Sequence, residues 1–184
     1  SLLLDFPGHR NVSDFYRDLD LATATATVGY AVDGIRYKRE MFTSFSDQVA
    51  VVRLTASERR RISFRISFAT PMQNYRVTTQ GNDRLLIDGR TDGHETIPGQ
   101  VEYRTVAEIS PEGGTTVADS AGITVTGADA VTILVSIATN FNDYKDISGD
   151  PVSRAEAYLT QAKKKSYKRL RARSEEHTSE LQSR

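Results

Sequence analysis

The sequence contains no cysteine and no tryptophan, and histidine occurs only three times. Without cysteine the chain has no disulfide, no thiol nucleophile and no thiolate ligand for a metal ion. His9, His94 and His177 lie far apart and form neither HxxxH nor HExxH, so we expect no metal site. The sequence also lacks GxSxG, GxGxxG and a phosphate-binding loop, and we expect no cofactor.

Charge and hydropathy argue against two further classes of protein, those that bind nucleic acids and those that span a membrane. The 24 basic and 24 acidic residues give a formal net charge of zero, which offers no reason to expect a nucleic-acid partner. The lysine run at 163–165 is then explained as the solvated face of a helix. Apolar runs such as VTILVSIA at 131–138 are too short to span a membrane. With 184 residues, one globular domain is expected.

Up to residue 150, much of the sequence alternates between apolar and polar residues, which is typical of half-buried strands. Such strands are expected at 22–32, 35–44, 48–56, 61–69, 75–80, 84–90, 100–110 and 130–141. Turn residues separate them. This pattern predicts a mainly β fold, an antiparallel β-sandwich of the super-sandwich type.

Two hairpins are predicted within the sandwich. Asp33-Gly34 alone separates 22–32 from 35–44, and this pair suits a type I′ turn because both positions need positive φ. The strands at 48–56 and 61–69 also follow each other closely, and we expect them to form a second hairpin.

The pattern changes at residue 150. Asp150 is a candidate N-cap with Pro151 at the first helical position, while Ser153 and Glu156 offer a competing capping box. The next residues at spacings of three and four, which would share one helix face, are Val152, Ala155, Leu159, Ala162, Ser166 and Leu170. They predict one C-terminal helix over 151–172, whose stripe has no helical partner in this chain.

The densest group of polar residues lies between the last strand and this helix, in ATNFNDYKDISGDP at 138–151. The candidate site residues are Asn140, Asn142, Asp143, Tyr144 and Asp146. Carboxylates and amides of this kind bind sugars or cations, or take part in acid–base chemistry. The alternative is a turn-rich junction in which Asn and Asp side chains bond to their own backbone.

SIATNFNDYKDISGDPVSRAEAYL at 136–159 resembles the end of the N-terminal β-domain of bacterial α-L-fucosidases, glycoside hydrolase family 95. YRDLDLATATATVGYAVDGIRYKREMFTSFSDQVAVVRLTA at 16–56 is similar to the opening strands of the same domain. The resemblance implies an N-terminal β-sandwich over 1–150 and the start of a helical linker over 151–172. An (α/α)6 barrel would follow in the complete enzyme.

The resemblance also implies an activity. Family members remove terminal α-L-fucosyl groups from glycans with inversion, and some prefer α-L-galactosides. Their catalytic glutamate and their asparagine-assisted aspartate lie on the barrel, so no catalytic residue is expected in this chain, and we expect the chain itself to be inactive. The fucosylated glycan would bind to the barrel.

We expect the loop at 140–150 to dock the sandwich against the barrel and to form part of the rim of the barrel's pocket. A stand-alone carbohydrate-binding module is the alternative, although such modules present exposed aromatics and this chain has no tryptophan. Other possibilities are a purely structural brace and a related maltose-phosphorylase-type enzyme.

Residues 173–184, RSEEHTSELQSR, interrupt the apolar stripe. RSEEHTSELQS matches the translation of an adapter used in sequencing libraries, so we expect 173–184 to be an artefact and the native sequence to run to about residue 172. We further expect the parent protein to be exported by a bacterium, to the periplasm or the medium.

Overall fold

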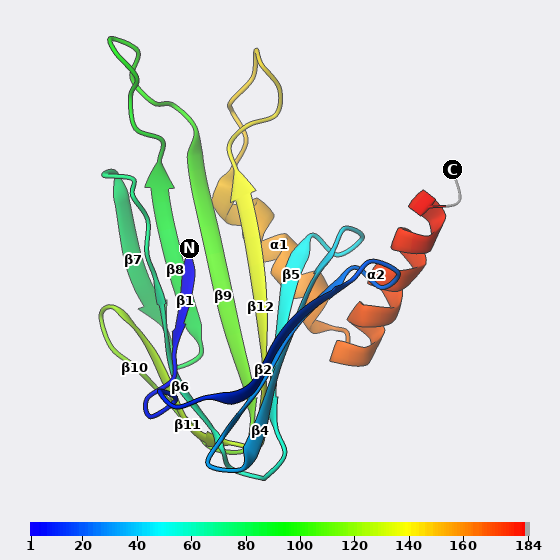
Figure 1. Ribbon diagram of the computed structural model, residues 1–184. Helices are drawn as coiled ribbons and strands as arrows, with labels where there is room; N and C mark the ends of the chain where they lie inside the picture. Colours follow the sequence, from blue (N-terminus) through cyan, green and yellow to red (C-terminus); the bar gives the residue numbers. More distant parts are fainter. Residues whose placement is uncertain (183–184) are drawn as a thin grey trace.

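A computed structural model describes the backbone of residues 1–182 and the side chains of residues 1–176. The described part is built from β-strands followed by two helices (Figure 1). The strands are β1 Leu2–Asp5, β2 Ser13–Asp20, β3 Thr25–Val32, β4 Ile35–Ser44, β5 Val49–Ala56, β6 Ile62–Phe68, β7 Tyr75–Gln80, β8 Arg84–Arg90, β9 Glu102–Glu112, β10 Thr115–Ala118, β11 Gly122–Ala128 and β12 Ala130–Thr139. The helices are α1 Pro151–Lys163 and α2 Tyr167–Gln182.

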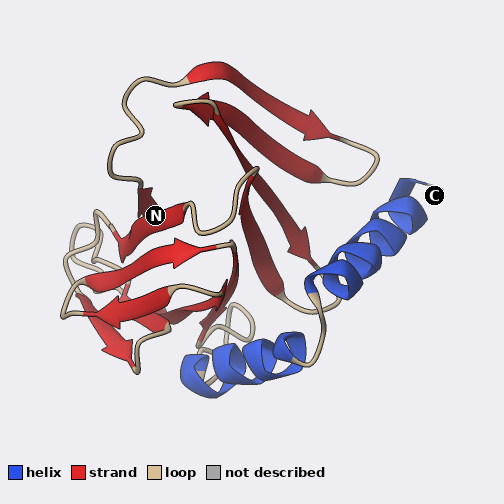
Figure 2. Ribbon diagram, turned by 90° about the horizontal axis from the view of Figure 1, so that it is seen from below, coloured by secondary structure: helices blue, strands red, loops and turns tan. Residues whose placement is uncertain are grey.

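The strands form two antiparallel sheets, as the sequence predicts. The small sheet has the order β1-β6-β11-β10, and the large sheet has the order β2-β3-β4-β5-β12-β9-β8-β7. The small sheet covers only the lower part of the large sheet in Figure 1, and the helices run along the outer side of the strands in Figure 2. The described residues therefore form a sandwich with helices on one outer face.

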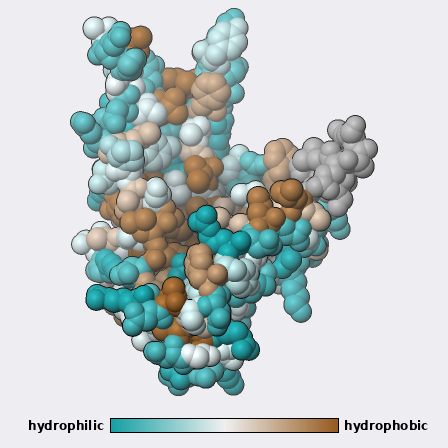
Figure 3. All heavy atoms as spheres, viewed as in Figure 1, coloured by the Kyte–Doolittle hydropathy of each residue, from teal (hydrophilic) through white to brown (hydrophobic). Residues whose placement is uncertain are grey.

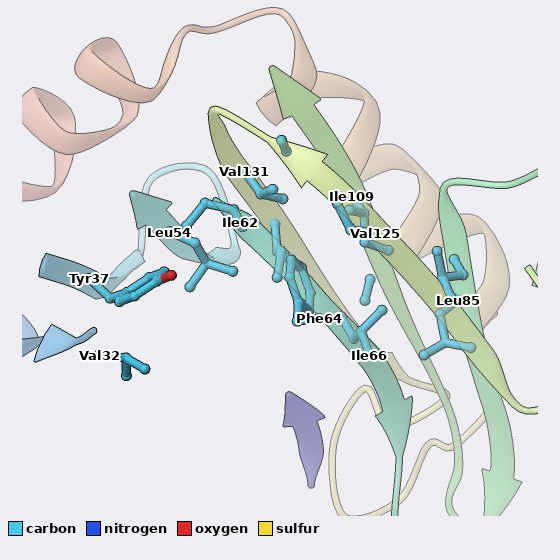
Figure 4. Close-up of a cluster of buried hydrophobic side chains, with 14 of the residues drawn as sticks. Val32, Tyr37, Leu54, Ile62, Phe64, Ile66, Leu85, Ile109, Val125 and Val131 are labelled. Atoms are coloured by element: carbon cyan, nitrogen blue, oxygen red, sulfur yellow. The ribbon is translucent and has the colours of Figure 1, made fainter. Parts of the chain in front are cut away.

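The main core lies between the two sheets (Figure 4). On β6 the predicted alternation is confirmed, because Ile62, Phe64 and Ile66 are buried to about 1% exposure or less. They meet Leu54 of β5 and Ile109 of β9 from the large sheet. Burial of apolar side chains at this density is the main force that holds the sheets together.

The predicted hairpin at Asp33-Gly34 is confirmed. Asp33 has φ 50° and Gly34 has φ 80°, which are the positive values that a type I′ turn needs. The flanking strands β3 and β4 pair in register from Val32 with Ile35 onward.

The second predicted hairpin is wrong. β5 pairs with β4 and β12 in the large sheet, whereas β6 pairs with β1 and β11 in the small sheet. The connection at 57–61 crosses from one sheet to the other. It is held by Asp129, whose carboxylate accepts a hydrogen bond from the Arg60 amide at 2.8 Å, where Arg60 adopts φ 61°. Alternation predicts which face of a strand is buried, but it does not name the neighbouring strand.

The single helix predicted over 151–172 is also wrong in part. Asp150 caps α1 as predicted, and its carboxylate accepts hydrogen bonds from the amides of Val152 and Ser153. The chain turns after Lys163, and α2 begins at Tyr167. The preceding residue, Ser166, accepts a hydrogen bond on its hydroxyl from the Arg169 amide at 3.3 Å. α2 then continues past residue 172. Among residues 1–182, neither helix is long and apolar enough to cross a membrane.

The apolar stripe of α1 does have a partner, contrary to the prediction. Ala155, Leu159 and Ala162 are buried against the outer face of the large sheet, in a second core that includes Val51 and Leu134. The reason is that β5 and β12 carry apolar residues on both faces, so the large sheet can be covered on both sides.

Candidate functional site

The loop at 140–150 rises beyond the end of β12, beside the loop that joins β8 to β9 (Figure 1). Asn140 lies at its base and is 7% exposed. Its side-chain oxygen accepts a hydrogen bond from the Glu102 amide at 3.0 Å, and its side-chain nitrogen donates to the Gln100 carbonyl at 3.2 Å. Asn140 therefore ties the bases of the two loops together.

Three of the predicted site residues come together above Asn140. The amides of Asn142 and Asp143 donate to the Asp146 carbonyl, at 2.9 and 3.1 Å. The Asn142 side chain also donates to the Asp146 carboxylate at 2.8 Å. The Asp143 carboxylate accepts from the Lys145 amide at 2.8 Å. These groups bond within the loop, as the turn-rich alternative describes.

Arg154 of α1 clamps the loop from the helix side. Its guanidinium donates to the carbonyls of Thr139 and Phe141 at 3.0 Å each, and also to the Asn142 side chain. The guanidinium lies where a Cβ at Gly149 would be, within 2.6 Å. A larger residue at this position would force the guanidinium of Arg154 to shift from its present place.

Hydrogen bonds keep two carboxylates of the loop ionised, those of Asp146 and Asp150. The side chain and amide of Ser148 and the side chain of Asn142 hold the pKa of Asp146 below its usual value. Hydrogen bonds from Ser153 do the same for the pKa of Asp150. An acid that must donate a proton near neutral pH needs a raised pKa, so these groups are unsuited to that role.

Tyr144 stands at the tip of the loop, in the turn enclosed by the paired backbones of Asp143 and Asp146. Its ring is 83% exposed, with the Lys145 ammonium 5.1 Å from the ring centre. Phe141 is 48% exposed on the same loop. A loop that is internally bonded and carries exposed aromatic side chains is suited to contact with another surface, rather than to chemistry of its own.

The histidines are not brought together. His9 packs against Tyr30 and Tyr37, while His94 sits in the β8–β9 loop, where its backbone pairs with Ile97. The side chain of His177 lies outside the described residues. Within the part of the chain whose side chains are described, no three His, Asp or Glu residues are grouped so that they could hold a metal ion.

Part of the inner face of the large sheet is not covered by the small sheet, and apolar side chains gather on this side of the molecule (Figure 3). Met41 is 51% exposed and Ile137 is 60% exposed. A hollow of about 320 Å³ opens between Ile137 and Val135 of β12 and Leu2 and Phe68 of the small sheet. Exposed apolar surface of this kind marks a contact site in many proteins.

One further candidate residue, Tyr16, was not singled out by the sequence patterns. It lies on β2, at the edge of the large sheet, and it is 50% exposed. The signal that could have found it is Gly29, a glycine inside the strand β3, because glycine within a strand often marks the close approach of another group.

Residues 1–144 match the family model described as "Glycosyl hydrolase family 65, N-terminal domain". The chain belongs to this family and is an N-terminal domain of a glycoside hydrolase.

Two individual proteins are similar to it. "Alpha-L-fucosidase 2" of Arabidopsis thaliana is 26% identical over 183 residues, a match that covers 88% of this chain. The solved structure of a "Putative kojibiose phosphorylase from human microbiome" shares the fold over 97% of the chain, with a TM-score of 0.62 and 12% identity. The chain spans 22% of the fucosidase and 27% of the phosphorylase chain.

Proposed function

We propose that this chain is the N-terminal, non-catalytic domain of an exo-acting, inverting α-L-fucosidase of family 95. The observation that carries the proposal is the match to a relative named as an α-L-fucosidase, which covers 88% of the chain. The sequence NFNDYKDISGDP at 140–151, which resembles the end of the family 95 β-domain, supports the same assignment. The barrel would supply the catalytic residues and bind the fucosylated glycan, and the parent protein would be exported.

The role proposed for the loop at 140–150 is to dock the sandwich against the barrel. Its internal hydrogen bonds and the Arg154 clamp would let it act as a rigid contact, with Tyr144 at the tip. The uncovered apolar face around Met41 and Ile137 would be shielded by the same partner.

The first test is to sequence the source DNA past the codon for Ala172. A reading frame that continues into further helices supports the proposal. The longer protein should then release L-fucose from 2′-fucosyllactose, with the β-anomer formed first, while the 184-residue chain releases none. A native stop codon directly after Arg184, or fucose release by the short chain, contradicts the proposal.

A phosphorylase is the second candidate, because the matching family model is that of family 65 and a similar structure is named as a kojibiose phosphorylase. The two candidates differ in their need for phosphate. An α-L-fucosidase cleaves its substrate in a phosphate-free buffer, whereas a phosphorylase requires inorganic phosphate and yields a sugar phosphate. Assaying the longer protein on 2′-fucosyllactose and on kojibiose, with and without phosphate, distinguishes them.

Hydrogen–deuterium exchange tests the docking role separately. In the longer protein, amides at 141–148 should exchange more slowly than in the 184-residue chain, since the barrel would cover them. The hairpin turn at Asp33-Gly34 serves as an internal reference. Equal exchange of 141–148 in both proteins would contradict docking by this loop, whatever the activity of the enzyme.

A further inference from the structure

Tyr16 forms an aromatic platform on the edge of the large sheet. A Cβ at Gly29 would overlap Cε1 of Tyr16 and stand 2.7 Å from its hydroxyl, so the ring covers the place where another residue would carry its side chain. The strand β2 is exposed along its whole length, and half of the Tyr16 surface remains open to solvent.

Polar side chains extend this platform along one row of the sheet. Tyr16 pairs with Gly29, Gly29 with Lys38, and Lys38 with Thr55. Residues directly opposite each other on neighbouring strands point to the same face of a sheet, so Tyr16, Lys38 and Thr55 share a face. This is the outer face, because Phe42 of the helix-covered core lies four residues beyond Lys38 on β4 and therefore points to the same side.

A hollow of about 460 Å³ lies over this row, and we call it the Tyr16 hollow. Its volume falls within the range of about 300–1,000 Å³ that is usual for small-molecule sites. Its lining includes Asp14, Tyr16, Arg36, Lys38, Thr55 and Ser57.

The chemistry of this lining fits a particular class of ligand. The Tyr16 ring offers an apolar surface, and around it stand a carboxylate, two cationic donors and two hydroxyls. A sugar ring has the matching features, with a face of C–H groups for stacking on an aromatic ring and a rim of hydroxyls that both donate and accept hydrogen bonds. The Lys38 ammonium is itself paired with Glu40 at 2.9 Å, which lessens any preference for an anion.

We propose that the Tyr16 hollow binds a neutral saccharide, with one sugar ring stacked on Tyr16. Gly29 makes the site possible because a larger residue there would push the ring away from β3. This binding is independent of the barrel and of the bond that the parent enzyme cleaves, so the fucosidase assignment and the saccharide site can fail separately.

The chain supplies a matched control on the opposite edge of the same sheet. Tyr75 of β7 is 47% exposed and pairs with Gly89, as Tyr16 pairs with Gly29. Gly89, however, is covered by Tyr103, whose hydroxyl would overlap a Cβ at that position. Tyr75 is therefore equally accessible, yet it does not cover the glycine that it pairs with.

The test is calorimetric titration of the purified 184-residue chain with cellohexaose, maltohexaose and 2′-fucosyllactose. At least one of them should bind. Tyr16→Ala should weaken that binding about tenfold, Gly29→Ala should weaken it in the same direction, and Tyr16→Phe and Tyr75→Ala should leave it within about twofold. Circular dichroism melting verifies that each variant is folded.

The proposal is overturned if none of the three sugars binds at about 10 mM. It is equally overturned if Tyr16→Ala binds as the wild type does, or if Tyr75→Ala alone abolishes binding. Should Tyr16→Ala fail to fold, Tyr16→Leu keeps apolar bulk at the edge and removes the aromatic ring, and the same loss of affinity is expected.

Discussion

The two faces of the large sheet are covered in different ways. The inner face meets the small sheet through aliphatic and aromatic side chains, such as Phe64 and Ile66, which are almost fully buried. The outer face meets the helices through a smaller core around Leu159, and ion pairs surround that core. Among the pairs, Lys163 of α1 lies 2.5 Å from Glu108 of β9, and Arg84 of β8 lies 2.6 Å from Glu156 of α1.

The difference shows what the helices contribute. Glu108 is 4% exposed and Asp47 is 5% exposed, and a carboxylate buried to this extent is costly unless it is paired. Lysines that follow the sandwich supply partners for both, since Lys165 lies 3.0 Å from Asp47. The segment after residue 150 therefore completes the sandwich instead of only leading away from it.

At Asp47, burial and hydrogen bonding act on the pKa of the carboxyl group in opposite directions. Burial acts to raise the pKa of Asp47, but hydrogen bonds from Ser44, Lys165 and Arg173 outweigh it and hold the pKa below its usual value. The carboxylate therefore stays ionised in the folded state, and the contact favours folding above the ordinary pKa of aspartate.

The largest effect is expected in the inner core. Phe64→Ala should lower the free energy of unfolding by about 3–5 kcal/mol, because it leaves a cavity between tightly packed sheets. The ring of Phe64 also stacks on Phe6 at a centroid distance of 5.2 Å. Urea denaturation followed by circular dichroism measures the change. Leu19→Ala, at a residue that is 59% exposed, is the control and should change stability little.

A smaller effect is expected in the outer core. Leu159→Ala should cost about 2–3 kcal/mol, near the lower end for buried leucine, because α1 can shift on the sheet to fill part of the cavity. The helical signal at 222 nm should be lost at lower urea concentration than the sheet signal. A cost equal to that of Phe64→Ala, with both signals lost together, would remove the distinction between the two faces.

The next largest effect is expected from removing the buried carboxylate of Glu108 on the outer face. Glu108→Gln keeps the shape of the side chain but removes the charge that faces Lys163 and Arg84, and it should cost about 1–3 kcal/mol. Glu112→Gln, whose side chain is 61% exposed and pairs with Arg53, is the matched control on the same strand. Equal effects of the two substitutions would show that burial of Glu108 does not matter.

The smallest effect is expected in the pH dependence of stability, and it arises from His9 on the inner face. Burial, with a smaller contribution from Arg39, lowers the pKa of His9 below 6.5. Below this pH the unfolded chain takes up a proton before the folded chain does, so the stability contributed by His9 is present above pH 6.5 and declines as pH falls through the folded pKa. His9→Gln should flatten the stability profile between about pH 5 and 7. An unchanged slope in this variant would show that His9 is not responsible.

Local signals in the sequence predicted local structure well. The type I′ hairpin needs only Asp33-Gly34 and its flanks, and the N-cap needs only Asp150 and the helix that follows. The proposed hairpin of β5 with β6 failed because two strands that are adjacent in sequence belong to different sheets. The partner of the α1 stripe was missed, although consecutive apolar residues in VAVV at 49–52 are the mark of a strand covered on both faces.

At the candidate site, too, local features could be predicted from the sequence and contacts with distant residues could not. Its position between the last strand and the first helix, and its density of Asn and Asp, could be predicted from the sequence. The local bonds of Asp143 and Asp146 agree with the turn-rich alternative. The contacts of Asn140 with Glu102 of β9 and of Asn142 with Arg154 of α1 could not be predicted, because they depend on distant elements. The proposed docking role of Tyr144 and its neighbours stays a prediction.

The position of β12 bears on how the chain folds. β12 is the last strand among residues 1–182, yet it lies in the middle of the large sheet, where it pairs with β5 on one side and β9 on the other. During synthesis the edges of β5 and β9 must therefore wait, unpaired, until residue 139 has left the ribosome. Contacts that span such long loops form slowly, and open strand edges invite aggregation in the meantime. A nascent chain shorter than this is expected to need protection by a chaperone.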